Sequence, residues 1–171
     1  MNKNIIVKLS GEFFEAAVIV LILYYVIFPV KITGESMHST LENNDRVLMS
    51  RAAAMLNLYD TGDIVVLDYN DGTKNIKIVK RIAAKSGDKI SIKDGSLYIN
   101  DVLKENYDCT GDNTEYILPD GEYFVLGDNP SRSTDSRFFG AVKKEDIKGL
   151  VVLRFYPLGE TEILLGKNSK N

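Results

Sequence analysis

Residues 75–82 read NIKIVKRI, and this stretch decides how the rest of the chain is interpreted. Its β-branched residues, and the turn residues that precede it, favour a strand. Successive side chains of a strand point to opposite faces, so one face carries the isoleucines at positions 76, 78 and 82 together with Lys80. Val79 and Arg81 belong to the other face. The alternation therefore predicts a lysine in phase with apolar side chains.

A lysine placed among isoleucines has two interpretations. Burial disfavours the ammonium form and lowers the pKa of the side chain, and a neutral amine beside a hydroxyl can accept its proton as a general base. Alternatively, the strand bends and Lys80 extends its ammonium group along the apolar surface to water. The periodicity alone favours this second interpretation.

Short β-rich runs separated by turn residues occupy the chain on both sides of this stretch. Asp94-Gly95, between KISI and LYIN, predicts a tight hairpin, because both residues tolerate positive φ values. One helix is expected over residues 51–58. Strands are expected at residues 46–50, 63–69, 75–83, 89–92, 97–99, 123–126 and 149–156. The pattern predicts a mostly β, antiparallel domain over residues 31–171.

Residues 16–30 read AAVIVLILYYVIFPV and contain no charged side chain. Counted from Phe13, a helix of this length rises about 27 Å, close to the thickness of a hydrocarbon core. We expect a single transmembrane helix over residues 13–30, after a short cytoplasmic N-terminus at residues 1–12. A cleaved signal peptide is the competing interpretation, but no A-x-A-like site follows the apolar run.

Flanking residues suggest how such a helix is oriented. Lys3 and Lys8 precede the apolar run, whereas only Lys31 closely follows it. This bias places the N-terminus in the cytoplasm and residues 31–171 outside it, as a single-pass protein of the cell membrane. Aromatic side chains near the outer end of the run suit the membrane interface; they are Tyr24, Tyr25 and Phe28.

Composition excludes several classes of function. The 171 residues carry 21 basic and 24 acidic side chains, a net charge of −3, which argues against nucleic acid as the main partner. Cys109 and His38 are the single cysteine and histidine, so neither a disulfide within the chain nor a His/Cys-rich zinc site can form. No nucleotide-binding or metalloprotease motif occurs. We expect no metal and no cofactor.

His38 lies two residues from Ser36, a separation of roughly 6–7 Å in extended chain. This is too far for a hydrogen bond without a tight local turn, so His38 is expected in a surface loop. A serine enzyme built on this chain needs another base.

Three segments occur in a fixed order behind the apolar run. They read GESMHSTL at residues 34–41, KRIAAKSGD at residues 80–88 and GDNPSRSTDSRFFG at residues 127–140. Together they resemble the three sequence boxes of the bacterial type I signal peptidases, in the form found in Gram-positive organisms. These are membrane-anchored serine peptidases that use a Ser/Lys dyad.

The resemblance implies a role for each matching residue. Ser36 corresponds to the nucleophile and Lys80 to the general base. Ser133 corresponds to a serine that orients the lysine amine. The oxyanion hole would include the Ser36 N–H, while Gly34 matches a position that supplies a hydroxyl in some relatives. Charged residues match positions of supporting ion pairs; they are Arg81, Asp128, Asp135 and Arg137.

The resemblance also implies the reaction and its substrate. Such enzymes remove signal peptides from secretory preproteins through an acyl-enzyme, cleaving after small residues in an Ala-X-Ala pattern. Val30, Ile32 and Val79 resemble the shallow apolar pockets that flank the nucleophile and the base. For Val30, a position at the membrane boundary without a role in substrate binding is an equally good interpretation. The expected partners are preproteins and the lipid bilayer, without nucleic acid.

The chain departs from the family pattern at several positions. Ser39 stands where proline is usual, residues 83–86 lack the usual glycine and proline, and Pro130 replaces a common arginine. We expect the change at Ser39 to loosen the loop around the nucleophile. These departures motivate a second hypothesis, a catalytically silent homologue that binds signal peptides or a secretion partner. A third hypothesis is a self-cleaving repressor-type Ser/Lys peptidase. Such a protein would carry a DNA-binding module at its N-terminus, where this chain has an apolar run.

Overall fold

The computed structural model of the chain describes residues 3–70, 72–110 and 113–166, and within its first helix it describes side chains only at residues 11–20, 23 and 26. Helices and strands follow one another in the order α1 (Lys3–Val26), β1 (Ile27–Lys31), β2 (Arg46–Ser50), α2 (Arg51–Met55), β3 (Ile64–Asn70), β4 (Asn75–Lys85), β5 (Lys89–Lys93), β6 (Ser96–Ile99), β7 (Val102–Asp108), β8 (Thr114–Ile117), β9 (Glu122–Leu126), α3 (Ser136–Phe139), β10 (Val142–Lys143), β11 (Ile147–Tyr156) and β12 (Glu162–Ile163).

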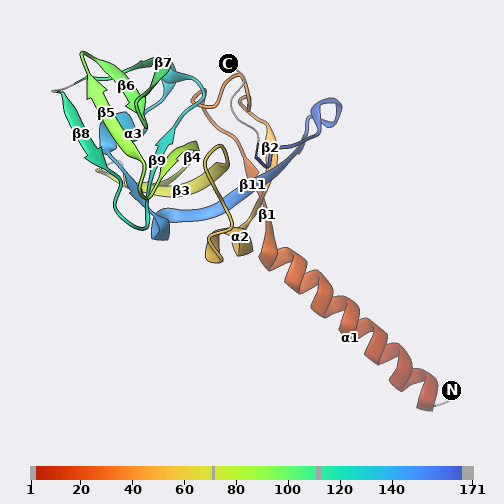
Figure 1. Cartoon of the computed structure of the whole chain (residues 1–171). Coiled ribbons are helices and arrows are strands. Elements are labelled where there is room, and N and C mark those ends of the chain that lie inside the picture. The colour runs from red at the N-terminus through yellow and green to blue at the C-terminus, as the bar shows by residue number, and fades with distance from the viewer. Residues whose placement is uncertain (1–2, 71, 111–112, 167–171) are drawn as a thin grey trace.

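Two antiparallel sheets make up the body of the molecule, and α1 projects from it (Figure 1). The larger sheet has the order β1-β2-β11-β3-β4-β9-β10, with β12 added to β11. The smaller sheet has the order β7-β6-β5-β8 and is inserted between β4 and β9 of the larger one. The prediction of a mostly β, antiparallel domain is confirmed.

The first helix ends earlier than the sequence predicts. It spans Lys3–Val26, and residues 27–30, expected in the same helix, belong to strand β1. Strand β1 pairs with β2 along its whole length, from Ile27 opposite Ser50 to Lys31 opposite Arg46. Pro29 is tolerated there because β1 lies at the edge of the sheet, where a missing N–H breaks no ladder.

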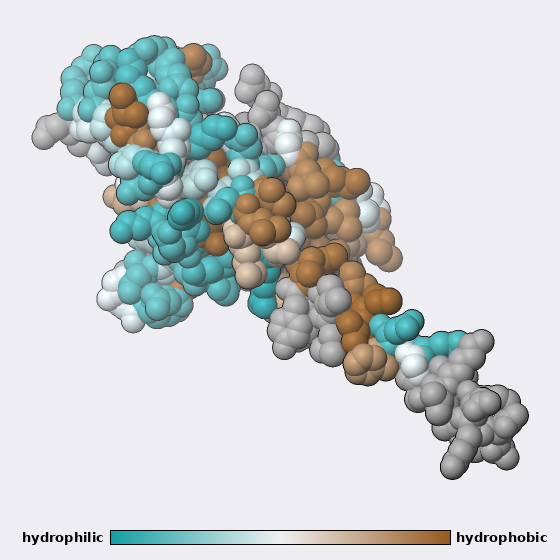
Figure 2. All heavy atoms as spheres, turned by 60° about the horizontal axis from the view of Figure 1, so that its bottom comes forward, coloured by the Kyte–Doolittle hydropathy of each residue, from teal (hydrophilic) through white to brown (hydrophobic). Residues whose placement is uncertain are grey.

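Within the described residues, no helix combines the length and the apolar character needed to cross a membrane. The side chains of Lys3, Lys8, Tyr24 and Tyr25, on which the predicted orientation depends, lie outside the described set, as do residues 1–2. Along the rest of the helix, exposed apolar side chains predominate, and Figure 2 shows that they continue onto the adjoining part of the body.

All seven predicted strands are present, with ends shifted by at most two residues. The hairpin at Asp94-Gly95 is confirmed, with φ values of 51° and 78°. The helix expected over residues 51–58 ends at Met55, because Asn57 adopts a left-handed φ of 53°. Strands β7 and β8 were missed because their side chains are largely polar and exposed, and so lack an apolar alternation.

One apolar cluster joins the two sheets. Phe124 of β9 is 1% exposed and packs in this cluster with Ile90 of β5 and Leu97 of β6. Burying these side chains fixes the smaller sheet against the larger one, since apolar area removed from water is the main stabilising contribution.

Phe124→Ala should lower the free energy of unfolding by about 3–5 kcal/mol, because it removes a buried ring and leaves a cavity between the sheets. Urea unfolding followed by circular dichroism measures the change. Phe138→Ala is the matched control: that ring is 57% exposed, so its loss should have a much smaller effect. A change below about 1 kcal/mol for Phe124→Ala would contradict the proposed packing.

Candidate active site

Lys80 lies in the middle of the larger sheet. It pairs with Val65 of β3, so both side chains leave the sheet on the same face. Val65, Ile78 and Ile82 pack in one apolar cluster on that face, as the alternation of residues 75–82 predicts. Lys80 is only 3% exposed. The interpretation in which it reaches water along a bent strand is therefore wrong.

Burial controls the ionisation of this lysine. Loss of hydration lowers the pKa of Lys80 from its ordinary value near 10.5 to about 8. Asp135 and Asp128 act in the opposite sense and raise the pKa, whereas Arg137 lowers it. Among the residues that the structure describes, no carboxylate forms an ion pair with Lys80. About a tenth of the side chain is therefore the neutral amine at pH 7, and about half of it at pH 8.

Ser36 reaches the same region from the turn that follows β1. It is half-buried and lines a cleft of about 280 Å³ together with Lys80. The cleft is also lined by the three residues predicted to form substrate pockets; they are Val30, Ile32 and Val79. Val30 and Val79 are partly buried against the core cluster that contains Ile32. The fold thus brings together five positions that are spread over 50 residues of sequence.

No hydrogen bond joins Ser36 to Lys80 across this cleft in the described part of the chain. Hydrogen bonds between catalytic groups are often long before substrate binds and shorten in the complex, so this separation does not exclude the pair. The roles inferred for Ser36 and Lys80 remain predictions.

Ser133 lies next to the turn that carries Ser36. A Cβ atom added to Gly127 would overlap Ser133 Oγ and lie 2.5 Å from the carbonyl oxygen of Ser36, so all three residues meet at one point. The Ser133 hydroxyl is buried and has no hydrogen-bond partner among the described residues. A buried hydroxyl without a partner is costly.

Two buried ion pairs support the segment that carries Ser133. Arg81 binds Asp128 with two parallel hydrogen bonds, from Nε to Oδ1 at 2.8 Å and from Nη2 to Oδ2 at 2.6 Å. Arg137 binds Asp135 in the same way, with Nε to Oδ1 at 2.8 Å and Nη2 to Oδ2 at 3.1 Å. Such two-point pairs fix orientation as well as charge.

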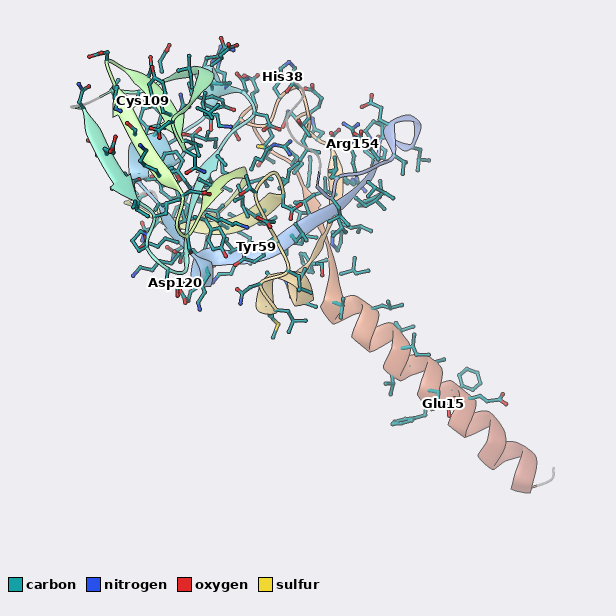
Figure 3. The ribbon with its side chains drawn as sticks, viewed as in Figure 1. Glu15, His38, Tyr59, Cys109, Asp120 and Arg154 are labelled. Atoms are coloured by element: carbon teal, nitrogen blue, oxygen red, sulfur yellow. The ribbon has the colours of Figure 1, made fainter. Side chains whose placement is uncertain are left out.

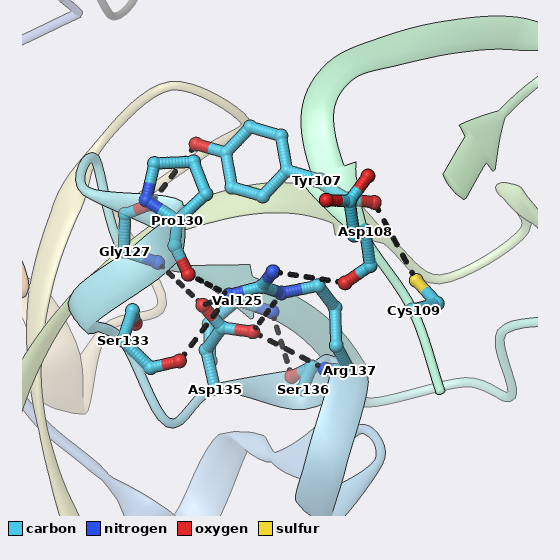
Figure 4. Close-up of polar contacts among 10 residues, drawn as sticks. All are labelled: Tyr107, Asp108, Cys109, Val125, Gly127, Pro130, Ser133, Asp135, Ser136 and Arg137. Atoms are coloured by element: carbon cyan, nitrogen blue, oxygen red, sulfur yellow. Dashed lines mark hydrogen bonds and ion pairs between the residues drawn. The ribbon is translucent and has the colours of Figure 1, made fainter. Parts of the chain in front are cut away.

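The Arg137–Asp135 pair also closes the surrounding backbone, as Figure 4 shows. Asp135 Oδ2 accepts a hydrogen bond from the N–H of Gly127, and Arg137 donates to the carbonyl oxygens of Pro130 and Ser133. The carboxylate of Asp135 and the guanidinium of Arg137 therefore fix the backbone of residues 127–137 through hydrogen bonds.

Tyr107 supplies a contact that the sequence analysis missed. Its hydroxyl donates a hydrogen bond of 2.9 Å to the carbonyl oxygen of Gly127, and burial raises the pKa of Tyr107 to about 12. Because Tyr107 belongs to β7, this bond ties the smaller sheet to the loop. No feature of the polar β7 sequence signals such a contact.

The side chain of His38 takes no part in this arrangement. It is exposed at the surface, where Figure 3 labels it, and its Nδ1 lies 2.8 Å from a carboxylate oxygen of Glu42. The prediction of a surface-loop histidine is confirmed.

The turn that carries Ser36 is closed by hydrogen bonds, although it lacks proline. Ser39 has a φ of 88°, which proline cannot adopt, and the amides of Thr40 and Leu41 both donate to the carbonyl oxygen of Met37. Leu41 is fully buried. The expectation that Ser39 loosens the turn stays a prediction. At the start of the turn, Gly34 is exposed and has a φ of 97°, a conformation that favours glycine.

Ser36 and the buried Lys80 thus line one cleft on an antiparallel β scaffold. The sequence pattern of one family, "Signal peptidase, peptidase S26", matches residues 7–156. The chain therefore belongs to this family and is a peptidase, which confirms the resemblance of its three motifs.

Two bacterial relatives agree with this assignment. Signal peptidase I of Bacillus licheniformis is 32% identical over 175 residues, covering 93% of each chain. Signal peptidase I U of Bacillus subtilis (strain 168) is 37% identical, covering 77% of each chain. A crystal structure of a signal peptidase I from Enterococcus faecalis V583 has 28% identity and a TM-score of 0.41, and covers 53% of this chain and 94% of its own.

Gly127→Ala should reduce the rate of peptide cleavage at least 100-fold, because the added methyl group cannot fit between Ser133 and the Ser36 carbonyl without moving one of them. Steady-state cleavage of a preprotein measures the loss. Gly159→Ala is the control, since nothing lies within 4 Å of a Cβ there. Full activity of Gly127→Ala would show that the contact among these three residues does not matter.

If Lys80 acts as the base, only its neutral form is active, so kcat/KM should rise with pH and level off above a midpoint near 8. The midpoint comes from initial rates measured between pH 6 and pH 10. A midpoint near that of a free lysine, about 10.4, would mean that the active base is not this buried amine.

Proposed function

We propose that the protein removes signal peptides from secretory preproteins, with Ser36 as the nucleophile and Lys80 as the general base. The observation that carries this proposal is that Ser36 and the buried Lys80 line one cleft, together with apolar residues at the predicted substrate positions. Membership of the signal peptidase family supplies the reaction class.

The chemistry follows from the protonation state of the lysine. The neutral Lys80 amine removes the proton from Ser36, and Ser36 Oγ attacks the scissile carbonyl carbon. The Ser36 N–H, with a second donor near Gly34, stabilises the negative oxygen of the tetrahedral intermediate. The Lys80 ammonium then gives its proton to the leaving amine, and water hydrolyses the acyl-enzyme with Lys80 again as base. Ser133 supplies the hydroxyl that orients the amine.

The substrate is proposed to bind as an extended strand and to be cut after small residues in an Ala-X-Ala pattern. Strand β4 pairs with β3 over residues 75–81 but with β9 only from Arg81 onward, so its first half has an unpaired edge beside the cleft. An extended peptide can add to such an edge. Val30, Ile32 and Val79 leave room for small side chains in a cleft of this size.

The apolar part of α1, from Phe13 to Val26, is proposed to anchor the protein in the cell membrane, with residues 1–12 cytoplasmic and residues 31–171 outside. This segment rises about 21 Å, so the bilayer must thin locally or the flanking residues must extend to its surfaces. Three exposed apolar residues at the α2 end of the body support a membrane-facing surface there; they are Met55, Leu56 and Leu58.

Ser36→Ala and Lys80→Met should each reduce cleavage of an Ala-X-Ala preprotein at least 1,000-fold, because each removes a reacting group. His38→Ala, a change next to the same turn, should retain activity within a few-fold. Cleavage by the purified full-length chain in detergent, with folding checked by circular dichroism, measures these effects.

Two results would contradict the proposal. Full activity of Lys80→Met would exclude the Ser/Lys mechanism. A wild-type protein that binds signal peptides without cutting them would identify the chain as a catalytically silent homologue.

A further inference from the structure

We propose that Asn129 is a positioning residue that orients the backbone N–H of Ser36 toward the oxyanion of the reaction. The inference rests on the proposed function, in which Ser36 is the nucleophile and its own N–H is an oxyanion donor. Asn129 itself touches neither substrate nor reacting atoms, and acts through the peptide group that joins Glu35 to Ser36.

Asn129 donates hydrogen bonds to two consecutive carbonyl groups of the turn that carries Ser36. Its side-chain Nδ2 donates a hydrogen bond of 3.0 Å to the carbonyl oxygen of Glu35. Its backbone N–H donates a bond of 3.0 Å to the carbonyl oxygen of Ser36. Because the two segments are more than 90 residues apart in sequence, these bonds fix the turn against the loop that carries Ser133.

The first of these bonds determines where the Ser36 N–H points. The Glu35 carbonyl and the Ser36 N–H belong to one planar trans peptide group, so they point in opposite directions. Holding the Glu35 oxygen therefore directs the Ser36 N–H to the other side of the peptide plane. The N–H of His38 donates to the same oxygen at 3.1 Å, so two donors fix this plane.

The Ser36 N–H is available for a ligand. Among the described residues, none accepts a hydrogen bond from it. Donation to the Glu35 oxygen also polarises the peptide group and strengthens its N–H as a donor, since hydrogen bonds in a chain reinforce one another. Asn129 thus aims this donor and strengthens it at the same time.

Ser131 fixes the orientation of the Asn129 amide. Its hydroxyl donates a hydrogen bond of 3.1 Å to Asn129 Oδ1, which leaves Nδ2 facing the Glu35 oxygen. The opposite orientation of the amide would set two oxygen atoms against each other. A relay therefore runs from Ser131 through Asn129 and Glu35 to the Ser36 N–H.

Asn129→Asp removes the hydrogen-bond donor of the side chain while keeping its shape. The variant keeps an oxygen for the Ser131 hydroxyl but loses the Nδ2 donor. Removing an oxyanion donor outright lowers kcat about 100- to 1,000-fold, so misdirecting one should lower kcat about 10- to 100-fold. KM for the peptide should change less than about three-fold, because the ground-state carbonyl depends little on this donor.

A peptide aldehyde ending in Ala-X-Ala provides a readout that a purely structural defect would not reproduce. Ser36 Oγ adds to its carbonyl carbon, and the former carbonyl oxygen occupies the oxyanion position. Its affinity should fall by the same factor as kcat in Asn129→Asp, while the affinity for the uncut peptide stays constant. Rates are compared on the high-pH plateau, so that the added carboxylate cannot act through Lys80.

Two further variants complete the experiment. Ser131→Ala should lower kcat several-fold, because the side-chain amide of Asn129 loses the hydrogen bond that fixes its orientation. This variant tests the inference if Asn129→Asp does not fold. Asn106→Asp makes the same chemical change at an exposed position of β7 and should leave both constants unchanged.

The inference would be overturned if Asn129→Asp and Ser131→Ala kept wild-type kcat, or if their losses appeared in KM or in thermal stability without weaker aldehyde binding. Failure of the proposed function has a different signature, because Ser36→Ala would then still cleave preprotein. An inactive Ser36→Ala beside a fully active Asn129→Asp would overturn this inference alone.

Discussion

The burial of the Lys80 amine, with no carboxylate ion-paired to it among the described residues, is the constraint on which the rest of the site depends. Below pH 8 the folded chain holds a charged Lys80 among apolar side chains, at a cost of about 3 kcal/mol for a pKa displaced from 10.5 to about 8. Because the pKa is lowered by folding, stability increases with pH between these two values, where only the unfolded chain keeps the proton. Packing around Val65 and Ile82 offsets this cost.

The surrounding ion pairs limit how far nearby carboxylates raise the pKa of Lys80. Asp128 and Asp135 both raise the pKa of Lys80, and unpaired carboxylates at these positions would favour the ammonium form. Each is bound at two points by an arginine, Arg81 or Arg137, which limits its influence on the lysine. The same pairs fix the loop of residues 127–137. One set of contacts therefore influences both the pKa of Lys80 and the position of the groups around it.

The sequence was informative where a pattern is local. Alternation in residues 75–82 correctly placed Lys80 in phase with the isoleucines, although it favoured a lysine that extends to water over the buried one that the structure has. Apolar runs predicted the long strands. Strand β1 was missed because its partner β2 begins 15 residues further on, and the apolar run gave no sign that the helix ends at Val26. The contacts of Asn129 and Tyr107 depend on tertiary approach, which a sequence motif does not reveal. The resemblance predicted Ser133 in the site, but only the fold shows that its buried hydroxyl has no hydrogen-bond partner in the part of the chain that is described.

The departures from the family pattern change how the site is held, while its reacting groups are kept. Proline at position 39 would rigidify the turn through its fixed φ, whereas here Ser39 adopts a φ of 88° and the turn is closed by hydrogen bonds to Met37. Ala84, in the segment that lacks glycine and proline, is fully buried and helps to form the cluster that joins the two sheets. Neither change alters Ser36, Lys80 or the ion pairs. This favours a working peptidase over a silent homologue, because a chain without a catalytic role has no reason to retain an amine that destabilises its fold at neutral pH.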